Sequence, residues 1–162
     1  MQTLDRDEVV RLVHAPPDAV YRLVSDVTRT PEHSPEILRC TWEDGATGPV
    51  VGARFEAVNK AGRGPAWKNH PVVTVAEPGR AFAVSRTEKA AGTIVWRYDL
   101  QPQPEGTLVR QSYEVLEPVS RLGWFVIGTL YGHKDRRAGL RDNMERSLAR
   151  VAAIVETAEV TA

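Results

Sequence analysis

Residues 93–115, TIVWRYDLQPQPEGTLVRQSYEV, carry the pattern that decides the fold of this chain. In both halves of the stretch, apolar or aromatic residues alternate with polar ones, as expected of a strand with one buried face. Trp96 and Tyr98 fall on one face, and Arg97 falls on the other. The turn-forming segment 101–106 between the halves is too short for a parallel crossover, so the stretch predicts two antiparallel strands.

The same alternation recurs upstream, interrupted by short turns rich in glycine and proline. It predicts six strands in all, at 37–42, 53–59, 67–76, 81–86, 93–100 and 107–115. Their short connections again require mostly antiparallel pairing. Nearer the N-terminus we expect a strand at 8–14, a helix that begins at Pro17, and a second short helix over 30–33.

The C-terminal third has the period of a helix. Apolar residues recur at steps of three or four from Leu140 to Val155, opposite a face of arginine and acidic residues. We expect an amphipathic helix packed along the sheet. The order of elements predicts one α+β domain over residues 1–162, a curved antiparallel sheet around a long C-terminal helix. The space between sheet and helix is expected to be a pocket of roughly 300–1,000 Å³.

Segment 118–132, between the last strand and the long helix, is unusually apolar for a link. One interpretation is a helical extension that packs against the sheet edge. The others are a movable gate over the mouth of the cavity, a dimer contact or a membrane contact. In the gate interpretation, Trp124 and Phe125 form the entrance to the cavity.

Composition excludes several classes of function. The 162 residues include 21 Lys+Arg and 21 Asp+Glu, and this zero net charge argues against a nucleic-acid partner. Cys40 is the only cysteine and the four histidines lack the spacing of metal ligands, so we expect neither a disulfide nor a metal site. The opening residues do not read as a signal peptide, and the longest apolar run, 124–127, is too short to cross a bilayer. We therefore expect a cytoplasmic protein without stable membrane insertion, and the excess of 17 Arg over 4 Lys points to a bacterial source.

Alternation also sorts the side chains of each strand, and the face with the bulky aromatics is taken as the interior. Leu38 and Cys40 belong to that face, on which polar side chains are scattered among apolar ones. A solid core excludes unpartnered polar groups, whereas a few of them in an apolar cavity orient a small ligand. The residues predicted to line the cavity, two of them from the long helix, are Trp42, Phe55, Asn59, Trp67, Asn69, Phe82, Trp96, Gln111, Met144 and Leu148.

Several short segments resemble the START-like (SRPBCC, birch-pollen-allergen-type) proteins. They include APPDAVY at 15–21, PEHSPE at 31–36, VGARF at 51–55 and EPGR at 77–80, and the resemblance extends over nearly the whole chain. It is closest to the bacterial members known as polyketide cyclases/dehydrases and lipid-transport proteins. The resemblance implies a helix-grip fold, in which a curved seven-stranded antiparallel sheet surrounds a long C-terminal helix and a deep hydrophobic cavity. His33 departs from the pattern, since many members have tryptophan there.

The resemblance leaves three classes of function open. The first is binding or transport of a hydrophobic small molecule such as a lipid, a polyketide or an aromatic compound, by a monomer or a homodimer. The second is a cofactor-independent polyketide cyclase/dehydratase, in which Arg86, Tyr98 and Tyr113 would polarise carbonyls and move protons during aldol cyclisation and dehydration. The third is a protein-interaction module that uses the surface of 118–132. None of the three requires a cofactor.

Overall fold

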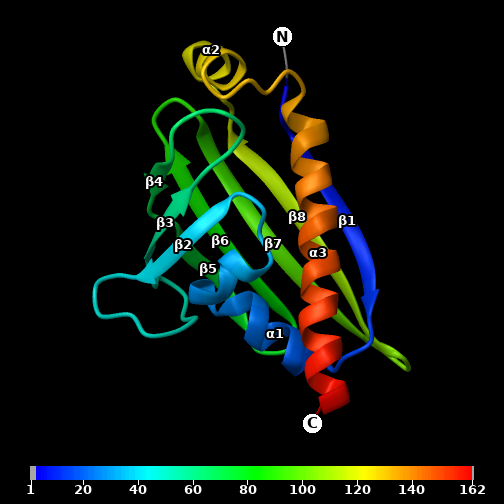
Figure 1. Ribbon diagram of the computed structural model, residues 1–162. Coiled ribbons are helices and arrows are strands. Elements are labelled where there is room, and N and C mark those ends of the chain that lie inside the picture. The colour runs from blue at the N-terminus through cyan, green and yellow to red at the C-terminus, as the bar shows by residue number, and fades with distance from the viewer. Residues whose placement is uncertain (1–2, 162) are drawn as a thin grey trace.

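A computed structural model describes residues 3–161 as antiparallel sheet wrapped around a long helix (Figure 1). The elements follow the predicted order. They are β1 (Arg6–Val13), α1 (Pro17–Ser25), the 3-10 helix η1 (Val27–Glu32), β2 (Ile37–Trp42), β3 (Phe55–Asn59), β4 (Trp67–Asn69), β5 (Val72–Glu77), β6 (Ala81–Glu88), β7 (Gly92–Gln103), β8 (Gly106–Glu117), α2 (Arg121–Thr129) and α3 (Arg136–Thr161).

The sheet is divided, which corrects the single seven-stranded sheet implied by the resemblance. Five strands pair in the order β1-β8-β7-β6-β5, and a separate three-stranded sheet has the order β2-β3-β4. The predicted strand 67–76 is broken in two at Pro71, because proline has no N–H to donate to a ladder. The first part, β4, stays with β3, while the second part, β5, pairs with β6.

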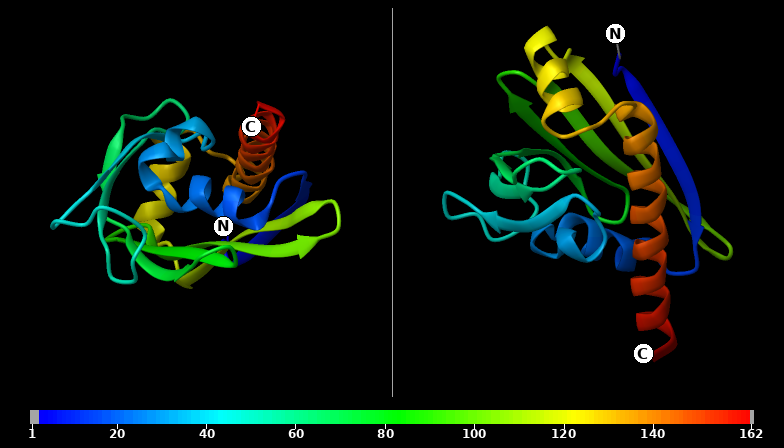
Figure 2. Two further views of the ribbon diagram at one scale, coloured as in Figure 1. Left: turned by 90° about the horizontal axis from the view of Figure 1, so that it is seen from below. Right: turned by 45° about the horizontal axis from the view of Figure 1, so that its top comes forward.

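Backbone hydrogen bonds join the two sheets at one end only. The Val73 N–H donates to the Ala53 carbonyl at 2.9 Å, and the Phe55 N–H donates to the Pro71 carbonyl at 3.2 Å. Seen from below, the two sheets form adjoining walls around α1 and α3 (Figure 2, left). The small sheet is therefore attached to the large sheet near Pro71, and β4 extends away from this attachment.

The helices form where the sequence places them. Pro17 opens α1 at the position where its missing N–H costs nothing, and Val20, Leu23 and Val24 are buried. The Asp26 side chain accepts a hydrogen bond from the Thr28 N–H at 3.1 Å and starts η1, which begins earlier than the predicted 30–33. In α3, the whole predicted stripe from Leu140 to Val155 is buried against the sheet and α1.

Segment 118–132 contains α2, as the helical interpretation predicts. Ser120 caps the helix by accepting a hydrogen bond from the Gly123 N–H at 3.0 Å. Gly123 lies against the Ala90 carbonyl of the β6–β7 hairpin, where a side chain would come within 2.0 Å of that oxygen. Glycine thus lets α2 dock on the end of the five-stranded sheet. Among residues 3–161, no helix combines the length and the apolar character that a membrane span needs.

Candidate ligand-binding cavity

A cavity of about 180 Å³ lies where the small sheet, the large sheet and α3 meet. Its walls are mainly apolar, with Phe55 from β3, Phe82 from β6, Trp96 from β7 and Met144 from α3. These strands supply the wall because their alternate residues face α3. The volume is smaller than the expected pocket, since side chains from α1, η1 and α3 fill much of the space.

A second chamber of about 260 Å³ continues the space toward α2. Ile94 and Leu140 form its floor, and Val126 and Ile127 of α2 cover it. The two chambers share four lining residues, namely Trp67, Arg86, Arg136 and Leu140. The two chambers are therefore direct neighbours, with the same four side chains bordering both.

Most of the residues predicted for the cavity lie in its wall. Those that line it are Phe55, Asn59, Trp67, Asn69, Phe82, Trp96, Gln111 and Met144, and Arg86 and Tyr98 line it too. Trp42 packs edge-on against Phe55 with ring centroids 5.7 Å apart, and Leu148 is buried in the solid core. Tyr113 packs against Trp96 at 5.3 Å without lining the cavity.

The assignment of Leu38 to the interior face was wrong. Leu38 is 56 % exposed, because the pairing of β2 with β3 shifts register between Ile37 and Arg39. A bulge of this kind turns one side chain out of the alternating pattern. Cys40, beyond the bulge, faces the cavity as predicted, and burial raises the pKa of its thiol to about 11.

Two buried amides in the cavity wall have unsatisfied oxygen atoms. Asn69 Oδ1 and Gln111 Oε1 are inaccessible to solvent and accept no hydrogen bond from any described residue. Leaving such a group unpaired costs about 1–3 kcal/mol. The neighbouring Asn59 is satisfied, since its Nδ2 donates to the Ala57 carbonyl at 3.2 Å. Two residues that line the cavity thus keep amide oxygens whose hydrogen-bonding capacity the protein itself does not use.

Three polar side chains, from β7, α3 and the residue after η1, line the same cavity. His33 Nδ1 lies 3.3 Å from Ser147 Oγ on α3, and Tyr98 lies in the wall on β7. Burial lowers the pKa of His33 to about 4 and raises the pKa of Tyr98 to about 12. At neutral pH the imidazole is therefore uncharged and the phenol keeps its proton. The cavity wall thus offers a proton acceptor at His33 and a proton donor at Tyr98.

Buried ion pairs occupy the other end of the cavity. Arg136 reaches across from α3 and makes a bidentate pair with Glu36, at 2.7 and 2.8 Å. Arg86 Nη1 donates to Glu88 Oε2 at 3.0 Å, and burial lowers the pKa of the Arg86 guanidinium. Burial raises the pKa of Glu36, but the hydrogen bonds and charge of Arg136 outweigh it and bring that pKa below its usual range.

The residues that sequence reasoning missed come from α3 and from the position directly after η1. His33, Ser147 and Asn143 line the cavity, yet neither a helix stripe nor strand alternation points to them. The sequence held one indication of these residues, because the chain departs from the family pattern at His33. Of the predicted entrance residues, Phe125 is 66 % exposed and Trp124 is half-buried, and neither lines a chamber.

A cluster of possible metal ligands lies outside the cavity, on the outer face of the small sheet. Glu43, Glu56 and His70 bring their ligand atoms within 4.8 Å of one another. The groups already pair with protein neighbours, because His70 Nδ1 lies 3.0 Å from the Glu43 carboxylate and Lys68 lies 3.1 Å from Glu56. Glu56 lies on β3, Glu43 follows β2 and His70 follows β4, and this separation along the chain hides the cluster from a search for local spacing.

The curved sheet, the long helix across it and the apolar cavity with a few polar groups define the class of helix-grip ligand-binding domains. The chain belongs to the family described as polyketide cyclase/dehydrase and lipid transport, whose model matches residues 7–156. The family expected from the sequence segments is thereby confirmed. No curated protein matches the chain.

Solved structures agree with this assignment. The polyketide cyclase-like protein Cgl2372 from Corynebacterium glutamicum is 35 % identical, with a TM-score of 0.50 over 96 % of this chain and 87 % of its own. The di-domain ARO/CYC StfQ from the steffimycin biosynthetic pathway has a TM-score of 0.74 at 18 % identity, over 95 % of this chain and 51 % of StfQ. CV1439 from Chromobacterium violaceum has a TM-score of 0.69 at 17 % identity, over 94 % of this chain and 99 % of its own. The last two similarities concern the fold alone.

Proposed function

We propose that this protein binds or transports a small hydrophobic molecule that carries hydrogen-bonding groups, in the cavity between the sheets and α3. The observation that carries the proposal is the pair of unsatisfied amide oxygens, Asn69 Oδ1 and Gln111 Oε1, on residues of a wall that is mainly apolar. A solid core has no use for such groups, whereas a ligand with hydroxyl or amine donors satisfies them. Membership of a family described by cyclisation, dehydration and lipid transport supports the same class of ligand.

Native mass spectrometry of freshly purified protein tests the proposal. We expect a small-molecule adduct on the native protein that is absent after denaturation. Gln111→Leu should lose the adduct while its free energy of unfolding stays equal or rises by about 1 kcal/mol, because an unsatisfied buried group has been removed. Ser112→Ala, one residue along on the opposite face of β8, is the matched control and should keep the adduct. The proposal would be contradicted if the wild-type protein carried no adduct and 1-anilinonaphthalene-8-sulfonate also failed to stabilise it.

The second candidate is a cofactor-independent cyclase/dehydratase. Tyr98 and His33 in the cavity wall favour it, because an uncharged imidazole and a protonated phenol beside the ligand can accept and donate protons. Arg86, at the far end of the cavity, would polarise a carbonyl. If the protein turns over a linear polyketone, Tyr98→Phe should retain binding and lose turnover. Tyr21→Phe, a buried tyrosine outside the cavity lining, should retain both.

We place the protein in the cytoplasm, as a monomer or a homodimer. The location rests on Cys40, a single buried thiol that pairs with no other cysteine. Analytical ultracentrifugation measures the oligomeric state directly, and fractionation of the source cells tests the location.

A further inference from the structure

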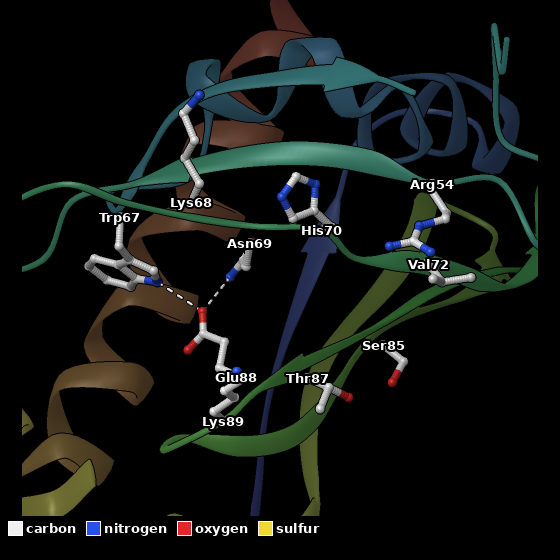
Figure 3. Close-up of a pocket in the computed structure, with 10 residues that line it drawn as sticks. All are labelled: Arg54, Trp67, Lys68, Asn69, His70, Val72, Ser85, Thr87, Glu88 and Lys89. Carbon is white, nitrogen blue, oxygen red and sulfur yellow. Dashed lines mark hydrogen bonds between the residues drawn. The ribbon is translucent and has the colours of Figure 1, made fainter. Parts of the chain in front are cut away.

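The wall of the cavity has a seam where β4 of the small sheet runs beside β6 of the large sheet. Within residues 3–161, no backbone hydrogen bond joins these two strands, whereas every other neighbouring pair in the two sheets is held by a ladder. The backbone bonds that tie the sheets together begin at Pro71 and continue along β5. Figure 3 shows the two strands separated, with side chains alone between them.

One carboxylate closes this seam. Glu88, at the end of β6, accepts hydrogen bonds at Oε1 from Trp67 Nε1 at 2.9 Å and from Asn69 Nδ2 at 2.8 Å (Figure 3). Its other oxygen accepts from Arg86 Nη1 at 3.0 Å, which anchors the carboxylate to its own strand. The link between β4 and β6 is therefore made by a single side chain.

The closed seam separates the cavity from an outer groove of about 780 Å³. Trp67 lines the groove and both inner chambers, Asn69 lines the groove and the first chamber, and Glu88 lines the groove and the second chamber. The partition is thus one layer of side chains thick. The other strands of the wall are joined by hydrogen-bonded ladders, whose opening would break many bonds at once, and α1, η1 and α3 cover the remaining sides.

We propose that the seam between β4 and β6 is the entrance to the cavity and that Glu88 is the latch that holds it closed. Rotation of the Glu88 side chain releases Trp67 and Asn69 together and leaves the small sheet, whose edge strand is β4, free to move about its attachment at Pro71. The inference rests on the proposed function, since an entrance matters only for a protein that takes up a ligand. It differs from the entrance at Trp124 and Phe125 expected from the sequence.

Cys40 offers a test that needs no ligand. It is the only cysteine, it is 6 % exposed, and it lines the inner cavity on β2, outside the seam. The rate at which 4,4′-dithiodipyridine modifies it reports how often the reagent reaches the cavity. We expect Glu88→Ala to raise this rate about tenfold or more and Glu88→Gln to raise it less, because the amide keeps an acceptor oxygen but loses the charge.

Three variants serve as controls. Asp99→Ala removes a carboxylate paired with Arg97 on β7 and should leave the rate at the wild-type value. Leu148→Ala shows how far general loss of stability accelerates labelling. Trp124→Ala tests the entrance at α2. The proposal is overturned if Glu88→Ala labels at the wild-type rate, if it labels no faster than Leu148→Ala after correction for stability, or if Trp124→Ala alone accelerates the reaction.

Failure of this proposal is distinct from failure of the proposed function. Unchanged labelling of Glu88→Ala, in a protein that carries an adduct in native mass spectrometry, rejects the seam and keeps the binding function. Accelerated labelling in a protein with no adduct and no affinity for 1-anilinonaphthalene-8-sulfonate supports the latch as an opening and rejects the binding function.

Discussion

His33 is an imidazole that is 1 % exposed, beside the positive charges of Arg29 and Arg150. Burial, opposed by Glu32 and reinforced by the two arginines, lowers its pKa from 6.5 to about 4. Between pH 6.5 and pH 4, the His33 imidazole binds a proton in the unfolded chain and stays unprotonated in the native protein. The native state therefore loses stability as the pH falls through this window.

From pH 7 to pH 5 we expect the free energy of unfolding to fall by about 2 kcal/mol on account of His33. Urea unfolding at the two pH values measures the change. In His33→Gln, which cannot take up the proton, most of this pH dependence should disappear. Burial also lowers the pKa of His133, so His133→Gln is the matched control and should keep the larger part of the slope. Equal slopes in wild type and His33→Gln would show that the imidazole titrates normally.

The pair of Arg136 and Glu36 is a second feature at the scale of single residues. Their side chains are 12 % and 19 % exposed, so neither charge can rely on water once its partner is removed. We expect Arg136→Ala to reduce the free energy of unfolding by about 3 kcal/mol. The double variant Arg136→Met, Glu36→Leu should lose less, because no buried charge is left unpaired.

The exposed pair of Arg146 and Asp142 is the comparison for this prediction, with side chains 53 % and 62 % exposed. Its removal by Asp142→Ala should cost less than 1 kcal/mol. Chemical unfolding of Arg136→Ala, the double variant and Asp142→Ala measures the three losses in the free energy of unfolding and ranks them. A double variant as unstable as Arg136→Ala would mean that the hydrogen bonds of the pair, rather than the stranded charge, carry the effect.

At the scale of elements, α3 has a packed part and a part that borders empty space. Leu148 is 1 % exposed and lies in the solid core, whereas Met144, one turn earlier, lines the cavity. Leu148→Ala should cost about 2–5 kcal/mol, and Met144→Ala should cost less, since a side chain beside a void gives up fewer contacts. Urea titration of both variants tests the order. If Leu148→Ala were the milder change, Leu148 would border the open space instead.

Most of the strands and helices could be predicted from the sequence. A buried face places apolar residues at every second position of a strand and at every third or fourth position of a helix. Alternation located the strands that wall the cavity, and the stripe from Leu140 to Val155 located α3. The division of the sheet was harder to foresee. Pro71 marked an interruption in the sequence, but only the three-dimensional pairing decides whether an interrupted strand stays in one sheet. The bulge after Ile37 has no such marker, and Leu38 was therefore assigned to the wrong face.

At the scale of the whole molecule, the strands contribute the predictable half of the cavity and the helices contribute the rest. For a strand residue such as Trp96, the alternation of polar and apolar residues predicts which face of the sheet carries the side chain. For a helix residue such as Ser147, the sequence gives no such prediction, because a small hydroxyl interrupts the apolar stripe and forms no other pattern. The open volume follows from how closely α1, η1 and α3 approach the sheets, and no single residue encodes that distance.

The pairing of β1 with β8 sets the order of events while the protein is being made. Arg6 lies opposite Glu114 and Val13 lies opposite Thr107, so the first strand leaves the ribosome long before its partner exists. At about 5–20 residues per second, β1 waits roughly 5–20 seconds for a strand roughly 100 residues downstream. Val9 and Val13, both buried in the finished fold, stay uncovered during that interval. The nascent chain is thus exposed to aggregation until translation nears its end, and slower codons between β1 and β8 would lengthen that exposure.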